Sequence, residues 1–188
     1  MSLTIVQAGM GGSGNPSLSF PSGTGTVAVQ GLSTNIVSGT AQASTSGTAI
    51  TFTGIPSYAK RITVMIQGIG TSTGTSSNYY QIQIGSGSLT TTGYASQLTY
   101  GTSSSGAITT GFVVSQVNSS YNFSGVITLV NINGNTWMSS GIMNLLSTSN
   151  TTYISIGYIS LSGVLDRVSV TTNGGFTLNA GTINILYE

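Results

Sequence analysis

Three short stretches of the sequence place residue types at spacings that chemistry uses. In "GMGGSG", Gly9, Gly11 and Gly14 have the G-x-G-x-x-G spacing of a dinucleotide-binding loop, directly after the apolar run "LTIV". Such a loop requires a following helix, whose N-terminal N–H groups meet the pyrophosphate, and an acidic residue about 20 positions further on for the ribose. The sequence continues with "NPSLSF", and its first acidic residue is Asp166. We therefore expect these glycines to permit tight turns and close approach to a neighbouring subunit, and not to bind a cofactor.

The second stretch, "SYAK", has Ser57 and Lys60 at the S-x-x-K spacing of penicillin-binding proteins, where the lysine lies one helical turn from a serine nucleophile. A proline precedes it, the strand-like "RITVMIQ" follows, and neither S-D-N nor K-T-G occurs in the chain. A serine hydrolase is therefore not indicated. We expect Lys60 and Arg61 to be charges that protect the start of a strand, and one of them to pair with Asp166.

The third stretch, "LDRVSV", contains the adjacent residues Asp166 and Arg167. The other carboxylate side chain of the sequence is that of Glu188, which we expect to be mobile or at an interface. Glycoside hydrolysis ordinarily needs a pair of carboxylates, and Ca²⁺ needs several oxygen ligands. An ion pair that anchors a turn is the better interpretation of Asp166 and Arg167.

The composition excludes most other chemistry. The sequence of 188 residues has no cysteine and no histidine, so thiolate nucleophiles, disulfides and the commonest base and metal ligand are absent. Charged residues make up 3% of it, against about 25% in an average protein. With three basic residues the chain offers no patch for nucleic acid, and its apolar runs are too short for a membrane-spanning helix. We expect no enzymatic activity, no cofactor and no metal site.

The pattern along the chain predicts an all-β protein. "RITVMIQGI" and "YYQIQIG" alternate apolar and polar residues with the period of two that is typical of half-buried strands. Asn133-Gly134 predicts a type I′ hairpin turn, and Asn173 to Gly175 a similar one. Eight to ten short antiparallel strands favour a β-sandwich or jelly roll. The further strand candidates are "TAITFTGI", "AITTGFVVSQV", "FSGVITLVNI", "NTWMSSGIMNLL", "TYISIGYISL", "DRVSVTT" and "GTINILYE".

The first part of the chain differs from the remainder. Residues 1–45 are rich in Gly, Ser and Thr with isolated apolar patches, whereas strand signals recur regularly over residues 46–188. We therefore expect an extended N-terminal attachment arm followed by one β-sandwich domain. Within the arm, the candidate partner-binding residues are apolar: Leu3, Ile5, Val6, Leu18 and Phe20.

The aromatic residues allow two interpretations. They could stack on sugars, or they could pack in the core and at interfaces, and we favour packing because buried aromatics contribute most per residue there. The candidates are Trp137, Tyr79, Tyr80, Tyr94, Tyr100, Tyr121, Tyr153, Tyr158 and Tyr187.

Several segments resemble a β-sandwich domain of tailed-bacteriophage and prophage virion proteins. The resemblance covers residues 46–188 and rests on "TSGTAITFTGIPSYAKRITVMIQGI", "YQIQIGSGSLTTTGYAS", "NGNTWMSSGIM", "LSGVLDRVSVTT" and "AGTINILYE". It implies a virion component, trimeric and without enzymatic activity. Family versions commonly carry acidic residues in the turn before this ending, whereas "NGGFTLNAG" is uncharged.

We expect a capsid decoration or cement protein, a homotrimer whose arm binds the major capsid protein and stabilises the shell. The alternative is a short tail fibre or receptor-binding tip, which attaches to a tail protein and recognises a host glycan. An independent carbohydrate-binding module is a third possibility. The start "MSLTIVQAG" lacks the basic and apolar regions of a signal peptide, so we expect synthesis in a bacterial cytoplasm before assembly into the virion.

Overall fold

A computed structural model describes residues 36–145 and 150–188. Within these ranges the chain forms fourteen β-strands, and no helix there is long and apolar enough to cross a membrane. Four of the strands have only two residues: β1 (Val37–Ser38), β2 (Gln42–Ala43), β6 (Ser88–Leu89) and β8 (Ser103–Ser104). The other ten are β3 (Ala49–Thr53), β4 (Arg61–Thr71), β5 (Tyr79–Ser86), β7 (Ala95–Tyr100), β9 (Phe112–Gln116), β10 (Phe123–Asn133), β11 (Thr136–Leu145), β12 (Thr151–Ser160), β13 (Arg167–Thr172) and β14 (Leu178–Tyr187).

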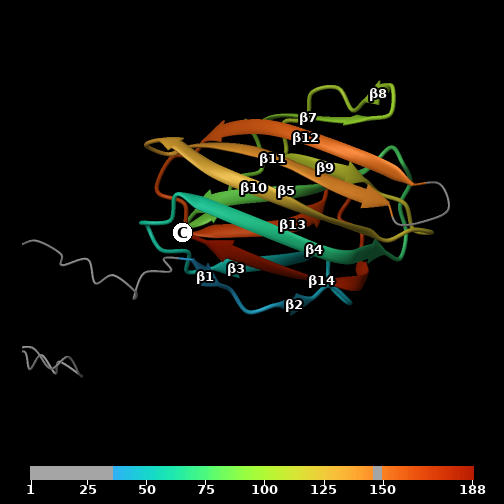
Figure 1. The fold of residues 1–188 in the computed structure, drawn as a ribbon, viewed down its shortest axis with the longest axis horizontal. Helices are drawn as coiled ribbons and strands as arrows, with labels where there is room; N and C mark the ends of the chain where they lie inside the picture. Colours follow the sequence, from blue (N-terminus) through green and yellow to red (C-terminus); the bar gives the residue numbers. More distant parts are fainter. Residues whose placement is uncertain (1–35, 146–149) are drawn as a thin grey trace, which may run out of the picture. The chain divides into compact units, whose positions relative to one another are not determined.

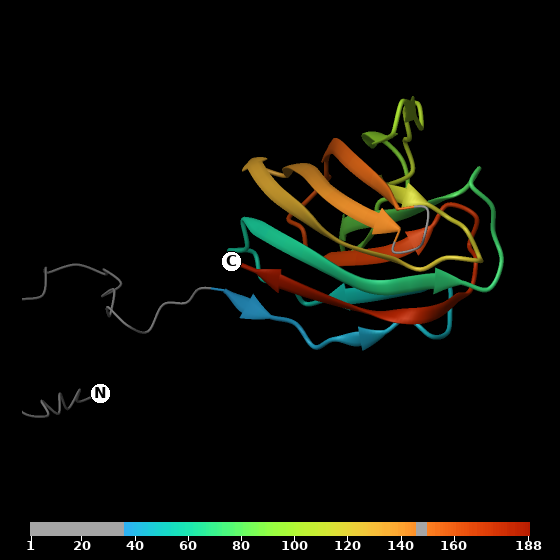
Figure 2. The ribbon, with the colours of Figure 1, turned by 45° about the vertical axis from the view of Figure 1, so that its right-hand side comes forward.

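The strands form two antiparallel sheets that pack against each other (Figure 1). In the described chain the larger sheet has the order β1-β14-β4-β10-β11-β12-β7-β8, with β2 also paired to β14. The smaller sheet has the order β3-β13-β5-β6, with β9 also paired to β5. Figure 2 shows β1 and β2, in blue, running beside β14, in dark red. The predicted antiparallel β-sandwich is confirmed, while its jelly-roll form stays a prediction.

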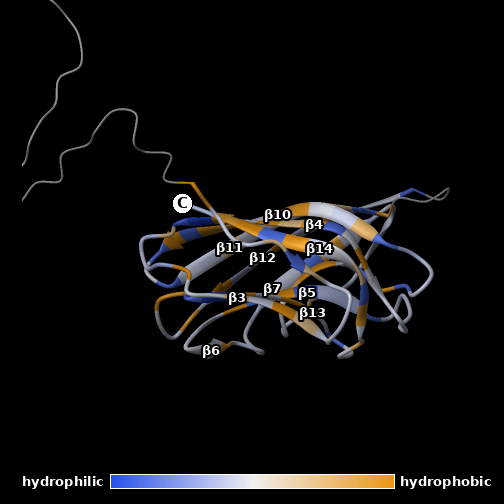
Figure 3. Ribbon diagram, turned by 90° about the horizontal axis from the view of Figure 1, so that it is seen from below, coloured by the Kyte–Doolittle hydropathy of each residue, from blue (hydrophilic) through white to orange (hydrophobic). Residues whose placement is uncertain are grey.

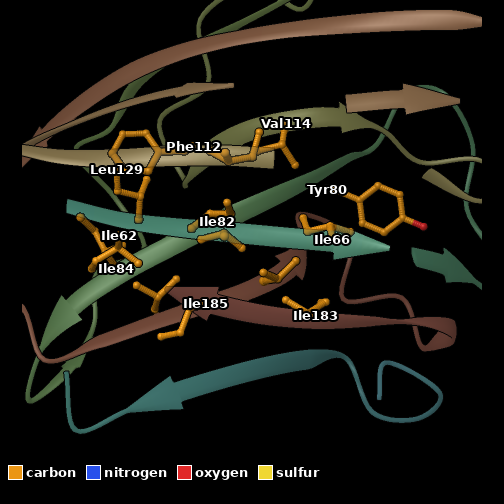
Figure 4. Packing of buried hydrophobic residues seen from close by; sticks show 14 of the residues in the cluster. Ile62, Ile66, Tyr80, Ile82, Ile84, Phe112, Val114, Leu129, Ile183 and Ile185 are labelled. Carbon is orange, nitrogen blue, oxygen red and sulfur yellow. The ribbon is translucent and has the colours of Figure 1, made fainter. Parts of the chain in front are cut away.

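The hydrophobic core lies between the two sheets. Ile62 and Leu129 of the larger sheet and Ile82 and Ile84 of the smaller sheet are each fully buried, and they approach one another in Figure 4. Figure 3 shows the sheets as separate layers, with hydrophobic residues recurring along the strands of both. The core therefore follows from strands whose alternate side chains point into one shared interior.

Nine of the ten longer strands overlap a strand segment expected from the sequence. The exception is β7, which was not predicted. In β7 the one large aliphatic residue is Leu98, which is fully buried beside small and polar neighbours, so the apolar alternation is weak. Its place in the sheet comes from pairing with β12, for example Leu98 with Ser155.

The expected boundary of the arm at residue 45 is wrong. Val37 pairs with Tyr187 and Gln42 with Ile183, so β1 and β2 extend the larger sheet beyond β14. Ser44 is fully buried, and its hydroxyl donates a hydrogen bond to the carbonyl oxygen of Ala180 at 2.7 Å. Residues 37–44 therefore belong to the sandwich, because they cover an edge strand that would otherwise offer unpaired backbone groups.

The two expected hairpin turns differ from the prediction. β10 and β11 do form a hairpin, with Asn133 paired to Thr136, but only Gly134 of its two-residue loop has a positive φ, of 52°. A type I′ turn requires a positive φ at both loop positions, so the predicted turn type is wrong. The segment at Asn173 to Gly175 is not a hairpin, because β13 lies in the smaller sheet and β14 in the larger.

Candidate interaction surface

The adjacent residues Asp166 and Arg167 form the expected ion pair at the start of β13. The Arg167 Nε donates to Asp166 Oδ1 at 2.8 Å, and the Gly87 N–H donates to the same carboxylate at 3.1 Å. The hydrogen bond from Arg167 is the largest cause, with help from Gly87, of a pKa of Asp166 below the usual range of a carboxyl group. The Asp166 carboxylate thus links the main chain of the turn after β5 to the side chain of the first residue of β13.

Neither Lys60 nor Arg61 pairs with Asp166, so that expectation is wrong. Arg61 forms an ion pair with Glu188, and the N–H groups of Lys60 and Arg61 both donate to the main-chain oxygen of Glu188. Glu188 is therefore held against the start of β4 and not left mobile. The reason is the pairing of β14 with β4, which places Tyr187 opposite Ile62 and Glu188 next to Arg61. Within the described residues Lys60 has no ion pair.

The S-x-x-K motif, which lies within the described residues, brings no reactive groups together. Ser57 and Lys60 lie on a single turn between β3 and β4, in which the Ala59 N–H donates to the Pro56 carbonyl oxygen at 3.0 Å. That arrangement is not the helix that an S-x-x-K catalyst needs. No group of three or more Asp, Glu, His or Cys side chains within the described ranges could hold a metal ion. The glycine motif at Gly9 to Gly14 and the arm residues Leu3, Ile5, Val6, Leu18 and Phe20 lie outside the described residues.

Most of the candidate aromatic residues are packing residues. Trp137 is buried, and Tyr80, Phe123 and Tyr153 form a chain of ring contacts in the core at centroid distances of 5.6 and 5.9 Å. Burial raises the pKa of Tyr80 to about 12 and that of Tyr94 to about 12. None of these buried rings is available to stack on a sugar. The exposed tyrosines among the described residues are Tyr58, Tyr121 and Tyr158.

The most prominent surface feature is an apolar sheet face that points away from the core. It is formed by β10, β11 and β12, which lie side by side in Figure 1. Directly opposed residues lie on the same face of a sheet, so the pairing of the three strands places these side chains in rows that run across the strands. We call this surface the outer face; its members are Val126, Val130, Met138, Ile142, Ile154, Ile156 and Tyr158, with Thr128 and Ser140 between them.

The rows of the outer face are continuous across the strands. Val126 pairs with Ile142, which pairs in turn with Ile154, and all three are about half exposed. In another row Met138 lies between Val130 and Tyr158. Two shallow hollows lie on this surface and share Ile156 in their linings.

The inner side of β12 has small residues at its centre. In β12 the residues that point inward at its centre are Ser155 and Gly157, while Ile154, Ile156 and Tyr158 point outward. The inward positions are small because β9 packs closely beneath them: a Cβ atom at Gly157 would lie 2.9 Å from Cδ1 of Phe112. At the centre of β12 the large apolar residues, Ile154 and Ile156, are thus the ones left on the surface of the chain.

No family model, curated protein or solved structure matches this chain. The resemblance to phage virion proteins therefore stays a prediction, and the surface itself provides the structural observations on function.

The outer face was not predicted from the sequence, although one strand carries a signal for it. In "TYISIGYISL" both alternating sets contain large apolar residues, which is unusual for a strand with one face in water. The two sets can be assigned to inside and outside only when the position of β9 is known. A strand with apolar residues on both sides predicts that each side is covered by something.

Proposed function

We propose that this chain is a structural subunit of a phage virion, a homotrimeric capsid decoration or cement protein that binds the major capsid protein and stabilises the shell. The observation that carries the proposal is the outer face. Monomeric soluble proteins rarely leave so continuous an apolar surface in contact with water, and such surfaces mark interaction sites. A subunit built to be packed among neighbours accounts for it.

The charge distribution supports the same role. Four of the five charged residues form ion pairs, Arg61 with Glu188 and Arg167 with Asp166. Few charges therefore remain to oppose association with another protein surface.

The binding of purified protein to capsids that lack it tests this proposal. We expect the full chain to cosediment with such shells and to raise the temperature at which they break open. Failure to bind, or binding that leaves that temperature unchanged, contradicts a cement function. Labelled protein found on tails and not on shells would support the alternative of a tail fibre or receptor-binding tip.

A further inference from the structure

We propose that the outer face is the surface through which copies of this chain pack against one another. This inference rests on the proposed function for its place in the virion, since it names the partner of one surface of the subunit. Its physical basis is independent of the virion and lies in the area, the charge and the shape of the face.

The area of the outer face suits a stable interface between copies. Its seven apolar side chains are between 40% and 58% exposed, from Met138 to Tyr158. Together they present roughly 650 Å² of accessible surface, and a specific interface of standard size buries about 800 Å² on each partner. A partner on this face would also cover Thr128 and Ser140 within it and the adjoining Gln97 of β7.

The charges favour a second copy over a charged partner. The neighbouring residue of β4 in the row of Val130 is Arg61, which is neutralised by Glu188. The nine residues of the face itself carry no charge. Two copies of such a face meet without like-charge repulsion, whereas nucleic acid or an acidic protein would find nothing to attract it.

The shape of the face allows copies to stack as the two sheets of this chain already do. Sheets pack face to face at about 10 Å through interdigitating β-branched and aromatic side chains. Val126, Ile142 and Ile154 give the surface that composition, and Thr128 and Ser140 offer hydroxyl groups at its centre. A face that stacks on the same face of a second copy makes an isologous contact with twofold symmetry, so the outer face joins copies in pairs, and the trimer of the proposed function needs a second, heterologous contact.

Measurement of the molar mass of the full chain tests the inference. We expect light scattering after size-exclusion chromatography, over about a hundredfold range of concentration, to give an oligomer that dissociates on dilution. Ile156→Lys places a charge at the centre of the face and should raise the dissociation constant by about 100-fold or more. Val164→Lys is the matched control, because Val164 is 55% exposed and Ile156 is 56% exposed, and Val164 lies in the connection between β12 and β13.

Each outcome bears on the inference. A wild-type chain that is monomeric throughout overturns it and leaves the arm of the same chain, or another protein, as the cover of the face. If the Ile156→Lys variant has the same molar mass in solution as the wild-type oligomer, the inference is also overturned. If far-ultraviolet circular dichroism shows that Ile156→Lys is unfolded, Ile156→Thr replaces it, because threonine retains the β-branched shape and should still weaken association about tenfold.

The result is separable from the capsid experiment. If the wild-type chain is an oligomer that Ile156→Lys dissociates, but the wild-type chain does not bind capsids, the self-association surface is supported and the cement function is contradicted. If the wild-type chain is a monomer that binds capsids, the cement function is supported and the self-association surface is contradicted. The two conclusions can therefore fail independently.

Discussion

The hydroxyl group of Tyr94 takes the place of a strand partner in the smaller sheet. Pairing between β5 and β9 ends at Ile82, and pairing between β5 and β6 begins at Gly85, so Ile84 lies between them. The Ile84 N–H donates to the Tyr94 hydroxyl at 2.8 Å, and this hydroxyl lies 3.0 Å from the Thr90 carbonyl oxygen, to which it can donate. A side chain thus satisfies a backbone group where the ladder is interrupted.

Replacement of Tyr94 by phenylalanine should cost about 2 kcal/mol of the free energy of unfolding. The Tyr94→Phe ring still makes the edge contact with Phe112, at a centroid distance of 5.0 Å, so the loss is confined to the hydroxyl. The Ile84 carbonyl oxygen keeps the Thr90 N–H at 3.0 Å, whereas the buried Ile84 N–H is left unsatisfied. The corresponding fall in Tm is about 4 to 8 °C.

Urea unfolding followed by the fluorescence of Trp137 measures this loss, because Trp137 is the one tryptophan of the sequence and is buried. All samples need the same protein concentration, since association adds to apparent stability. The control is Tyr58→Phe, because Tyr58 is 58% exposed and its hydroxyl has no hydrogen bond within the described residues. A loss below about 0.5 kcal/mol, or one equal to that of the control, would refute a partner role for the hydroxyl.

Three further predictions concern pH and the packing beneath the outer face. Burial raises the pKa of Tyr80 and Tyr94 to about 12. The folded state therefore retains these protons, and the stability that they contribute is complete below about pH 10 and lost between about pH 10 and 12. Phenolate absorbance and circular dichroism should then change together, and ionisation of the two groups in a folded protein would contradict this. The pKa of Asp166 is instead lowered, so its contribution is present above about pH 4 and lost as the pH falls through the lowered pKa. Asp166→Asn should thus reduce the decline in Tm on acidification, and an unchanged decline would exclude a contribution from this carboxylate. Gly157→Ala should lose about 1 to 3 kcal/mol in urea, because its Cβ would lie 2.9 Å from the Ala95 carbonyl oxygen, from Cδ1 of Phe112 and from Cβ of Ser96. Ser155→Ala is its control and should lose nothing, since the Ser155 hydroxyl has no hydrogen-bond partner within the described residues; equal losses would contradict the crowding.

The sequence predicted the features that depend on local pattern. Strand β4 follows from the alternation of Ile62, Val64 and Ile66, because a period of two separates the two sides of a strand. The ion pair of Asp166 and Arg167 follows from their adjacency. Neither feature depends on residues that are distant in the sequence.

The features that were missed depend on distant segments. Glu188 meets Arg61 only because β14 pairs with β4. The assignment of Ile154 and Ile156 to the surface depends on β9, whose Phe112 packs against the inner side of β12 at Gly157. Sequence periodicity gives two sets of side chains for each strand, and the position of the opposite sheet determines which set is buried.

The small inward residues of β12 have a consequence for how this protein can diversify. A substitution at Gly157 alters the packing against Phe112, and Ser155 lies on the same buried side of the strand, whereas Ile154, Ile156 and Tyr158 lie on the opposite, exposed side. Selection can therefore act on the choice of neighbour without disturbing the interior. Related chains that assemble with different neighbours should then keep the first set and vary the second.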